Sequence, residues 1–172
     1  MGIINKEVFG INENVAKEIL NVALSTGGEF AEVYMENTSN ESVEMLAGKV
    51  NKVNVNKVKG AAIRIIKDGT EVNCSLTKCD KDNLLSAAKV LSESFTGEKT
   101  TEVAEFNEKE VELVVNPKQV RGENLDQEIE LLTKASLGAK EYSNEVVQVM
   151  GNVTKKDQYM FVFSSDGTWQ KD

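Results

Sequence analysis

The chain has 172 residues, of which 40% are hydrophobic and 28% charged, a balance that predicts a folded domain with its own core and excludes a disordered chain. The 28 Asp and Glu against 20 Lys and Arg give a formal net charge of -8, which repels phosphate backbones and argues against nucleic acid as the main partner. With no apolar run long enough to span a membrane and no signal peptide at the start, we expect a cytoplasmic protein with no membrane partner.

The first part of the chain predicts a helix followed by a strand. Between Glu13 and Thr26 apolar residues recur with a 3.6-residue period, after Asn12 as an N-cap candidate and before the stop at Gly27-Gly28. From Phe30 to Glu36 apolar and polar residues alternate, which is the pattern of a half-buried strand. We expect a polar turn over residues 37–40.

The next stretch predicts a hairpin. Ala47-Gly48 joins two expected strands, Glu41–Leu46 and Lys49–Val58. The apolar register shifts between Val50 and Val53, which indicates a bulge or a bend.

A second hairpin is predicted within Ala61–Leu76. Asp68-Gly69 is a favoured pair for the two positive-φ positions of a type I′ turn. Such a turn places residues whose numbers sum to 137 opposite one another: Ile65 with Val72, Ile63 with Cys74, and Ala61 with Leu76.

The second half of the chain predicts two more helices and another hairpin. One helix follows the N-cap candidate Asp80 and closes at Gly97, and a third runs from Leu125 to near Gly138. The acidic connection over 98–124 contains one short strand, Val111–Val115, and the final hairpin has strands Glu145–Val153 and Gln158–Phe163 across residues 155–157. The elements together predict an α+β fold with a largely antiparallel β-sheet packed against three main α-helices, as a single domain over 1–172 with a second lobe over 123–172.

The residue types exclude most catalytic chemistry in this chain. The sequence contains no histidine, which removes Ser-His-Asp and Cys-His catalysis and the usual zinc sites. Cys74 and Cys79 are expected to be reduced and inert. We therefore assign no catalytic, cofactor-binding or metal-binding residue.

One run of charge remains as a candidate site. Between residues 49 and 67 the chain carries positive residues and no acid: Lys49, Lys52, Lys57, Lys59, Arg64 and Lys67. One interpretation is the solvated face of a sheet. The alternative is a docking patch for an acidic partner or a peptide carboxylate, with contacts from Lys49, Lys52, Lys57, Lys59 and Arg64.

The order of several short motifs resembles the N-terminal region of TldD/PmbA proteins, which are also labelled modulators of DNA gyrase. The resemblance is carried by three segments at the start and one near the end: Gly27 to Tyr34, Ser42 to Val50, Gly60 to Gly69, and Phe163-Ser164-Ser165-Asp166-Gly167. It implies a metal-dependent peptidase that works as a homodimer or as a heterodimer of related subunits enclosing a chamber for unfolded peptide. The family's H-E-x-x-x-H motif, which holds zinc or another divalent metal, belongs to a C-terminal region beyond this chain.

Two functions follow as hypotheses. In the first, the chain is the non-catalytic N-terminal domain of a TldD/PmbA-type metallopeptidase, with roles in subunit assembly and in enclosing the chamber, while proteolysis belongs to downstream sequence. In the second, it is a stand-alone protein- or peptide-binding module that uses an exposed strand edge and the Lys49–Lys67 basic island. A third, a hydrolase using carboxylates alone, has the least support.

Overall fold

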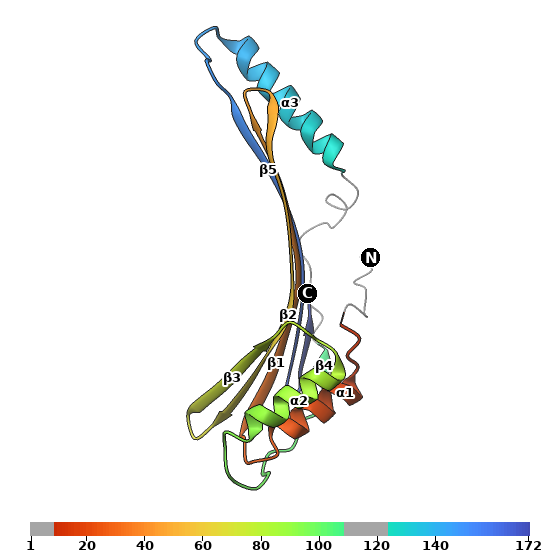
Figure 1. Ribbon diagram of the computed structural model, residues 1–172. Coiled ribbons are helices and arrows are strands. Elements are labelled where there is room, and N and C mark those ends of the chain that lie inside the picture. Colours follow the sequence, from red (N-terminus) through yellow and green to blue (C-terminus); the bar gives the residue numbers. More distant parts are fainter. Residues whose placement is uncertain (1–8, 109–123) are drawn as a thin grey trace. The chain divides into compact units, whose positions relative to one another are not determined.

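The computed structural model describes residues 9–108 and 124–172, and within them the chain folds into three helices and one mixed sheet (Figure 1). The sheet order is β3-β2-β1-β5-β6-β4, with β4 parallel to β6, β2 antiparallel to β3 and β5 antiparallel to β6. The α+β prediction with a largely antiparallel sheet is confirmed. In chain order the elements are α1 Glu13–Ala23, β1 Phe30–Leu46, β2 Lys49–Lys67, β3 Thr70–Leu76, α2 Lys81–Ser92, β4 Asn107–Glu108, α3 Leu125–Tyr142, β5 Met150–Ser164 and β6 Thr168–Lys171.

The described residues divide into two compact units, each with its own buried cluster. The first unit contains residues 9–37, 58–108 and 158–172, and the second contains residues 38–57 and 124–157. The lobe expected over 123–172 overlaps the second unit only over 124–157, because the chain returns to the first unit in the middle of β5.

The core of the first unit lies between the sheet and the helices α1 and α2. The Asn12 side chain accepts a hydrogen bond from the Val15 amide at 3.0 Å and so starts α1, as the sequence predicts. Ile19 and Leu20 of α1 pack fully buried with Leu84 of α2 against the sheet. Burying side chains of this size stabilises the unit by about 1.5–3 kcal/mol each relative to exposure.

The core of the second unit is smaller and includes an ion cluster. Leu132 of α3 packs on Val43 and Met45 of β1. Close to these residues, the Lys155 ammonium lies 3.2 Å from the Glu128 carboxylate and 2.9 Å from that of Glu41, and these contacts, Glu41 first, raise the Lys155 pKa. Glu128 is 4% exposed, so its charge depends on Lys155 for compensation.

The two turns predicted from glycine chemistry form as expected. Asp68 and Gly69 have φ of 48° and 71°, and the register pairs Ile65 with Val72 and Ile63 with Cys74. Ala47-Gly48 also forms a positive-φ pair, with φ of 50° and 79°.

Side-chain contacts between β1 and β2 indicate a shift in register near the Ala47-Gly48 turn. Asn51 donates to Glu44, and the two numbers add up to 95, as for the residues that flank the turn. Asn54 donates to Ser42 and Arg64 to Glu32, and each of these pairs adds up to 96. Residues that contact across two strands lie on the same face of the sheet, so along an unbroken pairing this sum cannot change by one. The change from 95 to 96 means that β2 holds an extra residue after Asn51.

Three boundaries predicted from polarity or an isolated glycine are wrong, because strands continue through them. The polar residues 37–40 lie inside β1, the break at Gly60 between the expected strand Lys49–Val58 and the expected hairpin Ala61–Leu76 lies inside β2, and residues 155–157 lie inside β5. β1 pairs with β2 on one side and β5 on the other, so the sheet satisfies the backbone of its polar residues without a turn. The predicted final hairpin is replaced by one between β5 and β6.

Several helix ends also differ from the prediction. α1 ends at Ala23 and α2 at Ser92, short of Thr26 and Gly97. α3 continues through Gly138 to Tyr142, since a single glycine weakens a helix by only about 1 kcal/mol. The strand expected over Val111–Val115 lies outside the described residues.

Candidate functional site

The residues that the structure describes contain neither a cluster of metal ligands nor an activated thiol. They contain no group of three or more His, Cys, Asp or Glu side chains placed to hold a metal ion. Burial raises the pKa of both the Cys74 and the Cys79 thiol, which keeps them protonated and poorly nucleophilic near neutral pH. Within the same ranges, no helix has the length and apolar character needed to cross a bilayer.

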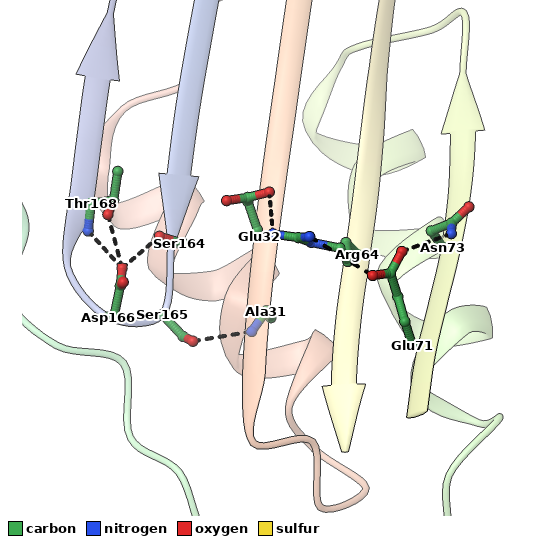
Figure 2. A network of polar contacts seen from close by, with 9 residues as sticks. All are labelled: Ala31, Glu32, Arg64, Glu71, Asn73, Ser164, Ser165, Asp166 and Thr168. Carbon is green, nitrogen blue, oxygen red and sulfur yellow. Dashed lines mark hydrogen bonds and ion pairs between the residues drawn. The ribbon is translucent and has the colours of Figure 1, made fainter. Parts of the chain in front are cut away.

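A row of polar contacts crosses β1, β2 and β3 in the first unit (Figure 2). The Arg64 guanidinium lies 3.0 Å from the Glu32 carboxylate and 3.8 Å from that of Glu71, which also accepts from Asn73 at 3.1 Å. The guanidinium carbon lies 5.7 Å from the centroid of the Phe30 ring. Arg64 is thus held between strands by contacts within its own fold.

A shallow pocket of about 320 Å³ lies in the same unit, between β1, β2 and the end of β3. The Tyr34 hydroxyl donates to the Glu36 carboxylate at 2.9 Å, and burial, followed by Glu36, raises the Tyr34 pKa. Gly60 forms part of the lining, and a Cβ there would lie 2.9 Å from the Leu76 carbonyl oxygen. A protonated phenol beside a carboxylate can bind a small polar group.

The Ser-Ser-Asp-Gly segment near the end of the chain forms the turn between β5 and β6 (Figure 2). Asp166 accepts hydrogen bonds from the Ser164 hydroxyl at 2.6 Å and from the Thr168 amide and hydroxyl, and these bonds, Ser164 first, lower its pKa. The Ser165 hydroxyl accepts from the Ala31 amide at 3.0 Å and so ties this turn to β1. The motif therefore has a structural part in the fold.

The predicted basic contact residues are divided between the two units. Lys49, Lys52 and Lys57 lie in the second unit, exposed, and form no ion pair in the described part of the chain. Lys59 and Arg64 belong to the first unit, and the Lys59 ammonium lies 5.7 Å from the centroid of the Phe9 ring. The ion pairs of Arg64 distinguish it from the exposed lysines of β2.

Sequence reasoning missed the pocket beside Tyr34. Tyr34 and Glu36 stand two positions apart on one strand and therefore share a face. That signal was available in the sequence, but the approach of Gly60 and Leu76 depends on the pairing of three strands, which spacing alone does not give.

The sequence and the fold each match known proteins. Residues 31–94 match the family described as PmbA/TldA metallopeptidase domain 1. A structure from Bacteroides thetaiotaomicron labelled a modulator of DNA gyrase aligns with a TM-score of 0.70 and 17% identity over 94% of this chain and 38% of that chain. TldE from Thermococcus kodakarensis aligns with a TM-score of 0.65 and 14% identity over 92% of this chain and 36% of that chain.

A third structure agrees with these two. A protein from Thermotoga maritima, also labelled a modulator of DNA gyrase, aligns with a TM-score of 0.68 and 15% identity over 93% of this chain and 36% of that chain. At such identities the structures establish the fold alone, and the chain spans little more than a third of their length. No curated protein sequence matches this chain.

Proposed function

We propose that this chain is the non-catalytic N-terminal domain of a TldD/PmbA-type metallopeptidase, a proposal supported by its match to PmbA/TldA metallopeptidase domain 1. In this role it supports subunit assembly and helps to enclose a chamber for unfolded peptide. The single observation that carries the proposal is the match of residues 31–94 to PmbA/TldA metallopeptidase domain 1. Its partners are unfolded peptide and an identical or related subunit.

The residue inventory supports a division of labour between domains. The 172 residues contain no histidine, and the described ones contain no cluster that fits a metal ion. We therefore assign hydrolysis and its metal, zinc or another divalent ion, to a separate C-terminal domain. No step of the reaction is assigned to this chain.

The second unit exposes apolar surface suited to assembly. Leu131 and Leu137 of α3 are 59% and 55% exposed, and Tyr142 at the end of the helix is 90% exposed. Leu131 and Tyr142 stand about three helical turns apart and so share one side of α3, where exposed apolar side chains can meet a partner. α3 is therefore the part of this domain that we expect to meet a second subunit.

The proposal is tested by peptidase and sedimentation assays on the full chain. With zinc and an unfolded fluorescent peptide, we expect no turnover, and metal-dependent cleavage by the purified chain would overturn the non-catalytic role. Analytical ultracentrifugation should detect self-association at micromolar concentration or a complex with a related full-length subunit. A chain that stays monomeric in both experiments would contradict the assembly role.

A matched pair of variants tests the place of α3. Leu131→Glu should weaken the association at least tenfold. The control is Val90→Glu in α2, which removes a 67% exposed apolar side chain from the first unit and should leave association unchanged. Equal effects of the two changes would contradict an α3 interface.

A further inference from the structure

We propose that the outer edge of β2 over residues 49–57, named here the basic edge, binds an acidic segment in extended conformation, which joins the sheet as an additional strand. The inference rests on the pairing and charge of this edge and does not depend on the family assignment. It concerns a surface that the proposed assembly through α3 leaves unused.

The backbone of the basic edge has pairing capacity left over. β3 lies beside β2 only over Ala61 to Lys67, the part of β2 distant from the Ala47-Gly48 turn (Figure 1). Over residues 49–57, β1 pairs with the inner side of β2, and no strand among the described residues pairs with its outer side. A strand edge with unpaired N–H and C=O groups is a template for adding another strand.

The exposure of this segment agrees with an open edge. Each residue from 49 to 57 is exposed, whereas Ile63 and Ile65 further along the same strand are fully buried. The segment is also longer than a typical strand of about 5–6 residues. The space is therefore sufficient for a guest strand of ordinary length.

The positive charge of the basic edge determines which kind of segment it binds. Lys49, Lys52 and Lys57 line it without an ion pair in the described ranges, and no acid occurs from residue 45 to residue 67. Pairing with the same edge of a second copy would place lysines against lysines, and like charges opposite each other are destabilising. Edge lysines thus protect this protein from self-pairing, while an acidic segment gains attraction from each of them.

The apolar side chains of the basic edge indicate which apolar residues the partner segment carries. Val50, Val53 and Val55 are 41%, 45% and 61% exposed and can cover β-branched side chains on a neighbouring strand. The fitting partner is an extended segment in which acidic and β-branched residues alternate. Asn51 and Asn54 are engaged with Glu44 and Ser42 of β1 and keep that neighbouring strand in register.

The first experiment measures binding of a defined probe to the full chain. The probe is a fluorescent ten-residue peptide of alternating Glu and Val, and the measurement is fluorescence anisotropy at two salt concentrations. We expect binding at low salt that weakens at least tenfold as salt rises, because exposed ion pairs are screened. Absence of binding, or equal binding of a Lys/Val peptide, would overturn the proposal.

Two sets of variants with the same charge change locate the site. Lys49→Gln, Lys52→Gln and Lys57→Gln combined should lower the affinity at least tenfold. The control combines the exposed lysines Lys78, Lys140 and Lys156, each changed to Gln, and should change the affinity less than threefold. Equal losses in both triple variants would show attraction to net charge alone and would overturn a site at this edge.

A third measurement separates strand addition from charge attraction. The same Glu/Val peptide with methyl groups on alternate backbone nitrogens keeps its charge but loses the donors that pair with an edge. We expect this peptide to lose binding, and the unmethylated peptide to slow hydrogen exchange of amides within residues 49–57. Retained binding of the methylated peptide, or unchanged exchange in that segment, would overturn strand addition.

Discussion

Lys155 offers a stringent test of how the second unit is held together, because one cation compensates two carboxylates of different burial. Replacing Lys155 with Met keeps the length and apolar stem of the side chain and removes the charge. The Glu41 side chain is 39% exposed and returns to water, whereas Glu128 is 4% exposed and keeps a carboxylate without its cation. Breaking a buried ion pair from one side destabilises a protein by about 3–5 kcal/mol.

We expect Lys155→Met to destabilise α3 by about 3 kcal/mol at pH 7, because the buried Glu128 carboxylate loses its cation. In the wild type the raised Lys155 pKa keeps the ammonium charged at this pH, and its contribution is lost only as the pH rises above the ordinary lysine value of about 10.4.

The assay must distinguish the two units. Hydrogen exchange of the α3 amides reports the second unit, and the fluorescence of Trp169, the single tryptophan, reports the first. Lys155→Met with Glu128→Met should recover most of the α3 protection, and Lys156→Met is the matched control because Lys156 is exposed. Unchanged α3 protection in Lys155→Met at pH 7, or an equal loss in the Lys156→Met control, would refute the reasoning.

Two further predictions concern the turn between β5 and β6. Hydrogen bonds, from Ser164 first, lower the Asp166 pKa, so the ionised side chain stabilises the fold fully above the ordinary aspartate pKa of about 3.9 and less as the pH falls below it. Asp166→Asn should therefore make the acid unfolding transition, followed by Trp169 fluorescence, less sensitive to pH. An unchanged acid transition would contradict this. Gly167 has φ of 93°, and a Cβ there would lie 2.5 Å from the Glu105 carbonyl oxygen. Gly167→Ala should therefore lower stability by about 1–3 kcal/mol or more, measured as a lower urea midpoint, and an unchanged midpoint would disprove the close approach.

The turns show which sequence signals predict the fold and which do not. Asp68-Gly69 was predicted correctly because a positive φ at consecutive positions is a local demand that few residue types meet, whereas the Ala47-Gly48 turn was indicated by its glycine alone. The boundaries expected over 37–40 and 155–157 rested on polarity, which an exposed strand also has. Whether such polar residues form a turn or a strand depends on whether neighbouring strands extend beside them, which is set by pairing between residues distant in sequence.

The candidate sites also divide into features visible in the local sequence and features that depend on strand pairing. The lysines of β2 were identified from the sequence because a run of one charge sign is visible in a single chain. Their separation from Arg64, which Glu32 and Glu71 hold, required the pairing of β1, β2 and β3. The pocket beside Tyr34 was missed for the same reason.

The path of the chain through the two units constrains how this domain can change in length. Residues 38–57 and 124–157 form the second unit, and each stretch leaves the first unit and returns to it. A deletion confined to one stretch would remove strand partners from the other, because β1 pairs with both β2 and β5. Natural variants of different size should therefore gain or lose residues in both stretches together, and a genetic fragment cut at any one point would separate residues that fold as neighbours.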